Sequence, residues 1–362
     1  MHSSTSSFER PVPAMPWTGL AVAAYLIAAV VTVAWEIRVR SQGYEPTLND
    51  TTDLWADRRE AVRPDALVVI GDSRPLFDID LDALEEGLGK RPIQLAIAGS
   101  GAYPILENLA NDESFKGDVV VSLVPAMFLT PGGYLEQASK DALRRHRSRS
   151  PSQRFSHHIA MFLEERIAFL QQEDLTLAML LQNIEIPNRP GALVPPRFPP
   201  YFQTVDRERR TRMADECAIV GSPMQQAVTA SWQRLFVPPP PPTWIPPEVF
   251  RETMGKGIEA RFGETAAAIA KIRARGGRVV WVRFPHTAWV KEMENIGTPR
   301  APTWDRMLQV TGAPGIHFED HPELAGFDCP EWSHLSAPDS VEFSKRLAPH
   351  LKRAFEERQP KS

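Results

Sequence analysis

The stretch Ala66–Arg74, ALVVIGDSR, places a serine directly after a short apolar run. Residues 66–70 are apolar and rich in β-branched side chains without polar alternation, which is typical of a central parallel strand buried on both faces. Gly71 permits a sharp turn at the end of this strand. A helix that begins after such a turn would direct its free N–H groups at charge developing near Ser73. We therefore take Ser73 as the candidate nucleophile.

The composition is that of a globular protein and gives no electrostatic reason to expect nucleic-acid binding. Of the 362 residues, 43% are hydrophobic and 24% are charged, and the formal net charge is −4. The two cysteines, Cys217 and Cys329, lie far apart and fit no metal-ligand spacing, so they are either free thiols or one disulfide. We expect neither a metal nor a cofactor.

Residues 17–35 form an uncharged stretch, WTGLAVAAYLIAAVVTVAW, behind a polar tail at 1–16 that we expect to be disordered. At a rise of about 1.5 Å per residue, a helix of this length covers about 28 Å, close to the thickness of a hydrocarbon core of about 30 Å. The alternative is a cleaved signal peptide, which has a shorter apolar region and a more basic start. We predict a retained transmembrane helix, followed by a linker at 36–61.

From residue 62 onward, strand signals alternate with helical stretches. This alternation predicts right-handed crossovers and a doubly wound parallel α/β sheet of about five strands, in which ligands bind outside the carboxyl ends of the strands. We predict one domain over 62–357 and a short tail at 358–362. The expected strands are ALVVI at 66–70, IQLAIA at 93–98, DVVVSLV at 118–124, RVVWVRF at 278–284 and GIHFED at 315–320.

The alternation is interrupted over 131–246, which we interpret as an insertion. It contains a basic run, a predicted helix and a proline-rich tract that ends in a polyproline run at 238–242. The apolar face of the predicted helix consists of Ile159, Phe162, Leu163 and Ile167. The insertion either shapes the site or docks a partner, or it is a solvated loop with a surface helix. His157 and His158 are expected at the surface rather than on a metal.

A second chemical signal lies at Phe327–Leu335, FDCPEWSHL, just before a predicted terminal helix. Ser336 and Asp339 suit a capping box at the start of this helix, and Pro349 is expected to kink or end it. His334 therefore lies on a loop that can return to the carboxyl edge of the sheet. The serine after the first strand and an acidic residue three positions before this histidine favour a catalytic role over a structural one.

These blocks resemble the SGNH (GDSL-like) hydrolase superfamily over residues 62–357, apart from the insertion. GDSR at 71–74 is similar to its nucleophile block, QLAIAGSGA at 94–102 to its glycine block and EWSHLS at 331–336 to its closing acid-x-x-histidine block. The resemblance implies a nucleophile at Ser73, a general base at His334 and an oxyanion donor in the backbone N–H of Gly99.

Two departures from the family pattern bear on the site. Glu331 stands where the family usually has aspartate, so the orienting acid is either Glu331 or the nearby Asp328. The family's Gly-x-Asn-Asp block after the third strand is missing, because that strand continues into LVPA at 123–126 without an asparagine.

Other side chains near these blocks have two interpretations each. Arg74 follows the nucleophile and either binds an anionic substrate group or forms a surface ion pair. Arg283 and His286 lie at the carboxyl end of the fourth predicted strand, where they either line the pocket or, for the arginine, pair with a neighbouring acid. Trp332 is expected to pack the loop rather than stack on a sugar.

The apolar span, the serine block soon after it and the closing SHLS resemble membrane-anchored members that work beside membrane-bound O-acyltransferases in acylating exopolysaccharide or teichoic acid. The resemblance implies a serine esterase or O-acyltransferase at the inner membrane, with its domain in the periplasm or outside the cell. Its substrate would be a polysaccharide or acyl ester, and its partner a membrane acyltransferase. The alternative is a non-catalytic scaffold with a degenerate site. Arg10 before the span and Arg38 and Arg40 after it give no firm orientation.

Overall fold

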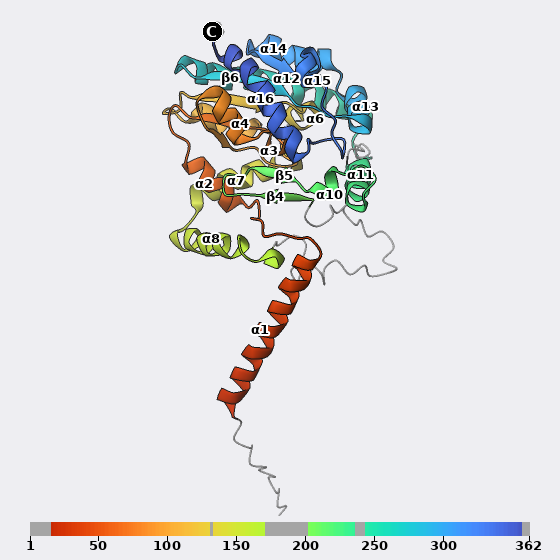
Figure 1. Cartoon of the computed structure of the whole chain (residues 1–362). Coiled ribbons are helices and arrows are strands. Elements are labelled where there is room, and N and C mark those ends of the chain that lie inside the picture. The colour runs from red at the N-terminus through yellow and green to blue at the C-terminus, as the bar shows by residue number, and fades with distance from the viewer. Residues whose placement is uncertain (1–15, 131–132, 171–201, 236–242, 357–362) are drawn as a thin grey trace, which may run out of the picture.

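The computed structural model describes residues 16–130, 133–170, 202–235 and 243–356. A five-stranded parallel sheet with the order β2-β1-β3-β6-β7 forms the centre of the domain (Figure 1). Its strands are β1 (Leu67–Ile70), β2 (Pro92–Gln94), β3 (Asp118–Ser122), β6 (Arg278–Arg283) and β7 (Gly315–His317). The predicted parallel α/β sheet is confirmed. Strands β2 and β7 are shorter than their apolar patterns indicated: β2 ends at Gln94, and after β7 the chain enters a 3-10 helix at Phe318.

Successive strand residues point to opposite faces of the sheet, so the domain has two hydrophobic cores. Val68 and Ile70 of β1 belong to one core, whereas Leu67 and Val69 belong to the other. The helices that complete these cores are α5 (Tyr103–Asn111) and α12 (Pro247–Ala274) on the first face, and α4 (Leu81–Leu88) and α16 (Ala337–Glu356) on the second. Burial on both faces explains the continuous apolar runs of the central strands.

Helix α16 begins with the predicted capping interaction. The Ser336 hydroxyl accepts a hydrogen bond from the Asp339 backbone N–H (3.3 Å) and donates one to the Asp339 carboxylate (2.6 Å). Pro349 does not end the helix, contrary to one of the two expectations. Leu347 and Leu351 on either side of it are buried, and this packing holds both halves of the helix against the sheet.

The chain leaves the sheet after β3 and returns at β6. The elements between them are α6 (Pro125–Leu129), η1 (Tyr134–Glu136), α7 (Gln137–Ser148), α8 (Pro151–Glu164), η2 (Ala168–Leu170), β4 (Gln203–Val205), β5 (Thr211–Met213), α10 (Asp215–Ala218), α11 (Pro223–Leu235) and α12. The antiparallel pair of β4 and β5 was not predicted, because strands of three residues leave too little alternation to recognise. The polyproline run at 238–242, all but the last residue of the predicted tail at 1–16 and the predicted tail at 358–362 lie outside the described residues.

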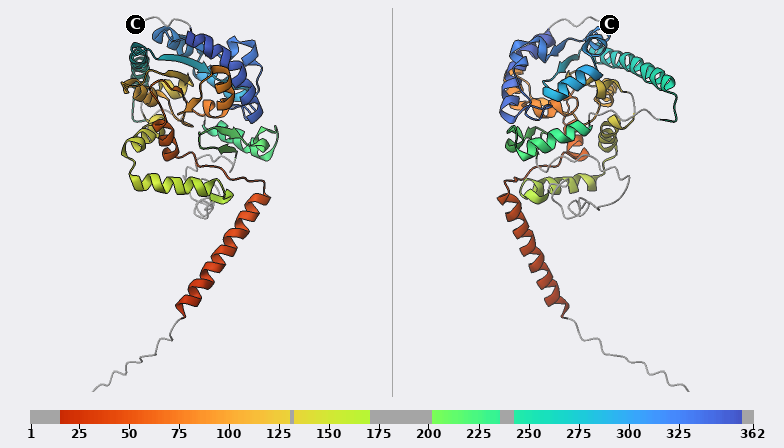
Figure 2. Two further views of the ribbon diagram at one scale, coloured as in Figure 1. Left: turned by 60° about the vertical axis from the view of Figure 1, so that its left-hand side comes forward. Right: turned by 90° about the vertical axis from the view of Figure 1, so that its right-hand side faces the viewer.

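Helix α1 (Trp17–Ser41) extends away from the domain (Figures 1 and 2). The most apolar 18-residue stretch of this helix has a mean hydropathy of 2.1, and none of that stretch is buried. The helix is therefore long and apolar enough to cross a membrane. The helix continues past the predicted span at 17–35. The predicted linker at 36–61 contains a further helix, α2 (Thr52–Glu60), which packs on the domain through the buried Trp55.

Candidate active site

Ser73 lies at the carboxyl edge of the sheet, between β1 and the short helix α3 (Arg74–Asp78). Gly71 makes this turn possible: a Cβ atom there would lie 2.5 Å from Cβ of Ser122 and 2.7 Å from Cγ of Pro75. The missing side chain therefore lets the turn after β1 lie directly against β3. Ser73 itself is half-buried, so its hydroxyl remains accessible.

A continuous chain of hydrogen bonds joins Ser73, His334 and Glu331. The Ser73 Oγ and the His334 Nε2 are 2.8 Å apart, and the His334 Nδ1 and the Glu331 Oε1 are also 2.8 Å apart. The backbone N–H of His334 donates to the same carboxylate oxygen at 2.6 Å. His334 is 1% exposed and Glu331 is 0% exposed, so the contact between the histidine and the acid is shielded from water.

Of the two acids that the sequence left open, Glu331 is the one that contacts the histidine. Asp328 is exposed and makes no hydrogen bond among the described residues. The loop turns at Trp332, whose φ of 79° is unusual for a residue with a side chain, and this turn points the Glu331 carboxylate back at the backbone N–H and the ring Nδ1 of His334.

Two aromatic side chains hold the histidine and the acid in place. The Phe77 ring stacks on the His334 ring with centroids 4.3 Å apart and an interplanar angle of 25°. The Trp232 indole N–H donates a hydrogen bond to Oε2 of Glu331, the oxygen that His334 does not use. Trp232 lies on α11, so a helix from the segment between β3 and β6 completes the surroundings of the carboxylate. Neither aromatic residue was predicted from the sequence.

Asp78 was also missed, and it supports the loop that carries His334. Its Oδ1 accepts a hydrogen bond from the Leu335 backbone N–H at 2.8 Å, and its side chain is fully buried. Burial raises the pKa of Asp78 well above its ordinary value, even though the hydrogen bond from Leu335 and the charge of Arg74 act in the opposite direction. The interior of the domain therefore favours the protonated form of this carboxyl more than water does.

The surroundings of Arg74 and Arg283 do not fit most of the roles predicted for these two arginines. Both side chains are buried and form ion pairs with the same carboxylate, that of Glu294 on α13 (Ala288–Gly297). Arg74 is thus neither a surface ion pair nor free to bind a substrate anion. Arg283 also donates a hydrogen bond to the Leu123 carbonyl oxygen at 2.9 Å. The alternative that paired this strand-end arginine with a neighbouring acid is confirmed.

Arg74, Arg283, Glu294 and His286 form one buried cluster, and the charges of its arginines shift the pKa values of Glu294 and His286. Burial alone would raise the pKa of Glu294, but the positive charges of Arg283 and Arg74 outweigh it and hold this pKa far below the usual value. Burial, together with the same two arginines, lowers the pKa of His286 to about 2. His286 is therefore a neutral structural group beneath the site, not a base that lines it.

The backbone N–H groups of Ser73 and Gly99 are the expected oxyanion donors. Gly99 lies in the turn after β2, the strand beside β1, and its φ of 65° favours glycine. Among the described residues, no hydrogen bond uses the backbone N–H of Ser73 or that of Gly99. The side chains at 123–126 offer no third polar donor, and the hydroxyl of Ser122 is used by the Asp72 carboxylate at 3.0 Å.

The cysteines and the paired histidines of the sequence take no part in the hydrogen-bonded chain of Ser73, His334 and Glu331. Cys217 and Cys329 are buried free thiols, so they form no disulfide in this structure. Burial raises the pKa of Cys217 to about 12 and that of Cys329 well above its ordinary value. His158 is exposed as expected, whereas His157 is buried with its Nε2 3.2 Å from Oδ2 of Asp57.

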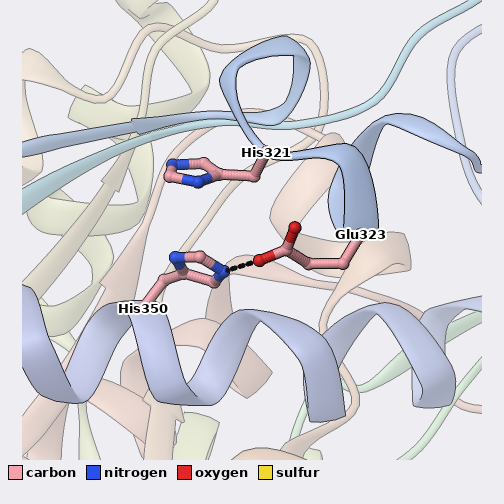
Figure 3. A group of neighbouring side chains, drawn as sticks. All are labelled: His321, Glu323 and His350. Carbon is pink, nitrogen blue, oxygen red and sulfur yellow. Dashed lines mark hydrogen bonds and ion pairs between the residues drawn. The ribbon is translucent and has the colours of Figure 1, made fainter.

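A group of possible metal ligands, His321, Glu323 and His350, lies where α15 (Pro322–Ala325) meets α16. Their ligand atoms lie within 4.8 Å of one another, and zinc sites use such side chains. In Figure 3 the two imidazole rings lie one above the other, with centroids 4.2 Å apart and an interplanar angle of 49°. His350 is hydrogen-bonded to Glu323 at 2.7 Å. We interpret the group as a contact that ties the two helices together.

A comparison of the chain with models of known protein families finds no match, and a comparison with curated proteins finds no similar sequence. The resemblance to SGNH hydrolases therefore remains a prediction from the three sequence blocks. The function has to be inferred from the geometry around Ser73.

Proposed function

We propose that the protein is a serine-dependent acyl-transfer enzyme of the SGNH type. The observation that supports this proposal is the hydrogen-bonded chain from Ser73 Oγ through His334 to the buried carboxylate of Glu331. A serine hydroxyl becomes a useful nucleophile when an imidazole can accept its proton and a carboxylate fixes the imidazole tautomer.

The reaction would begin when the Ser73 oxygen attacks the carbonyl carbon of an acyl ester and its proton moves to His334 Nε2. The resulting oxyanion would accept hydrogen bonds from the backbone N–H groups of Ser73 and Gly99. Its collapse breaks the bond to the alcohol, which leaves with the proton from His334, and forms an acyl ester on Ser73. Water or a sugar hydroxyl then attacks this ester while His334 accepts its proton, and collapse of the second oxyanion breaks the bond to Ser73, whose oxygen takes the proton back from His334. The acceptor decides between an esterase and an O-acyltransferase.

The membrane-crossing character of α1 supports a substrate at the cell envelope. We propose a polysaccharide as the acyl acceptor or ester substrate, and a membrane-bound O-acyltransferase as the partner that supplies acyl groups. The domain would then lie on the periplasmic or extracellular side of the inner membrane.

The proposal is tested with the full-length protein in detergent and a fluorophosphonate probe, which forms a covalent bond to an activated serine. We expect Ser73→Ala to abolish labelling and to lower turnover of an activated acetyl ester by about 10³-fold or more. Ser114→Ala, which replaces an exposed serine away from the site, should behave like the wild type. Undiminished labelling of Ser73→Ala would remove Ser73 from the mechanism.

A second candidate function is that of a scaffold for a membrane acyltransferase. The absence of a polar side chain at 123–126 favours it, because an oxyanion with two donors is stabilised less than one with three. A folded wild-type protein that neither reacts with the probe nor turns over any acyl ester would support the scaffold and contradict the enzyme.

A further inference from the structure

Helix α8 exposes a stripe of large apolar side chains. Phe155 is 68% exposed, Ile159 46%, Phe162 52% and Leu163 39%. Their spacing places all four on one side of the helix. Single exposed apolar residues are common on soluble proteins, but a continuous stripe with two phenylalanines marks a surface that contacts another apolar phase.

The opposite side of α8 attaches the helix to the domain. Met161 packs with Leu54 of α2 and with neighbouring apolar residues, and the Glu164 carboxylate accepts a hydrogen bond from the Asn49 backbone N–H at 3.0 Å. Together with the contact of His157 to α2, these interactions place α2 between α8 and the sheet. The apolar stripe therefore faces away from the domain.

The C-terminal end of α8 is joined to the end of α1 through η2. The Glu36 carboxylate of α1 accepts hydrogen bonds from the backbone N–H groups of Ala168 (2.9 Å) and Phe169 (3.3 Å). Arg40 donates to the Arg166 carbonyl oxygen at 2.7 Å. Trp35 and Phe169 pack in the same small apolar cluster. In all three views of Figures 1 and 2, α8 lies across the end of α1 at the base of the domain.

We propose that α8 is an interfacial helix, whose stripe is inserted in the headgroup and acyl-chain boundary of the bilayer that α1 crosses. Trp35 lies where a spanning helix carries its interfacial aromatic residue, and the contacts of Glu36 hold α8 at this same level. An amphipathic helix parallel to the surface inserts its apolar side by several ångströms and keeps its polar edge in the headgroups.

The polar edge of the stripe suits a lipid surface. The Arg166 guanidinium lies 3.8 Å above the Phe162 ring, and its side chain is 54% exposed. An arginine in this position can lay its apolar stem along the stripe while its charge reaches lipid phosphates. A bilayer also accounts for the location of the stripe, because α8 and the end of α1 lie on the same side of the domain.

The proposal is tested on the full-length protein in nanodiscs that contain only phosphatidylcholine and phosphatidylglycerol. Single cysteines at Phe155→Cys and Ile159→Cys would carry an environment-sensitive fluorophore. The native thiols of Cys217 and Cys329 are buried and have raised pKa values, so they should not compete for labelling. The matched control is Val310→Cys on α14 (Arg306–Thr311), an exposed position at the far end of the domain from α1 (Figure 1).

Lipids with a nitroxide near the glycerol backbone should quench the fluorophore at both α8 positions and leave the control unchanged. Aqueous iodide should show the reverse order. If neither α8 position is quenched by the lipid nitroxide, the proposal is wrong. Protection that appears only in native membranes would likewise overturn it and would identify the stripe as a site for a protein partner. Fluorophosphonate labelling of the same samples reports on Ser73 independently, so failure of one proposal does not imply failure of the other.

Discussion

The carboxylate of Glu331 receives hydrogen bonds from the His334 ring, the His334 backbone and the Trp232 indole. The indole is the one described partner of Oε2, which makes Trp232 a positioning residue for the acid. Loss of a hydrogen bond to a buried charge costs about 1.5–3 kcal/mol. How the acid is held should therefore affect the rate at which Ser73 reacts.

We predict that Trp232→Phe lowers the rate of fluorophosphonate labelling by about 10- to 100-fold, the equivalent of that energy. Because Trp232 contacts the acid, we expect kcat for an activated ester to fall while KM changes little. Trp244→Phe is the control, since Trp244 is 81% exposed. A rise in KM with unchanged kcat would show that Trp232 binds substrate and does not position Glu331.

At this scale, sequence reasoning identified the residues whose roles follow from local patterns. Ser73 was found from the strand and glycine before it, and His334 from the acid three positions earlier. Trp232, Phe77 and Asp78 were missed because their contacts depend on how distant helices fold back onto the loop, which a local pattern does not encode. Whether Ser73 and His334 catalyse a reaction stays a prediction.

Three elements meet at one buried carboxylate below the site. Arg74 at the start of α3 and Arg283 at the end of β6 both pair with Glu294 of α13. Removing the shared acid leaves two buried guanidinium groups without their counter-charge, which is far more costly than losing a surface ion pair. The cluster therefore fixes the turn that presents Ser73.

We predict that Glu294→Gln lowers the free energy of unfolding by about 3–5 kcal/mol, measured by denaturant titration of the full-length protein in detergent. The matched control is Glu252→Gln, which breaks an exposed ion pair with Lys256 on α12 and should cost less than about 1 kcal/mol. Similar losses for both variants would mean that the buried cluster contributes no more than a surface pair.

Element prediction succeeded where a strong pattern extends over a long segment. The central strands were recognised because burial on both faces demands uninterrupted apolar residues, as at 118–122. The same logic failed for α2, whose sequence TDLWADRRE is mostly polar and whose burial depends on Leu54 and Trp55. It also failed for β4 and β5, whose pairing is set by tertiary contacts.

The stability of the whole molecule should depend on pH through His286. Its pKa is about 2 in the folded protein and about 6.5 in an unfolded chain, so the unfolded chain binds a proton that the folded protein excludes. Above about pH 6.5 His286 is neutral in both states and has no effect on stability through its proton, but as the pH falls below that value proton uptake by the unfolded chain lowers the free energy of unfolding progressively, by at most about 1.4 kcal/mol per pH unit.

We therefore predict that His286→Asn flattens the fall in unfolding free energy between about pH 7 and about pH 5. The variant and the wild type are compared by denaturant titration across this range. The control is His158→Asn, which replaces an exposed histidine and should keep the wild-type slope. An unchanged slope for His286→Asn would show that other groups cause the acid sensitivity.

The orientation of the molecule in the cell is a prediction at the same scale. We expect a short cytoplasmic tail before α1 and an exported domain, so a reporter fused after Ser362 should give active alkaline phosphatase. The matched fusion to green fluorescent protein should be dark. A fluorescent fusion with inactive phosphatase would overturn both the orientation and the polysaccharide substrate.

The contacts of Glu36 with Ala168 and Phe169 join α1 directly to the folded domain. A domain on a flexible tether samples many heights and tilts, whereas one that is clamped to its anchor retains chiefly rotation about the membrane normal and lateral drift. Ser73 would then stay at a constant height above the membrane surface while the domain rotates. Ser73 would therefore search for substrate in two dimensions only. It would reach a polymer that extends to its own height above the membrane, but not one that lies flat against the lipid.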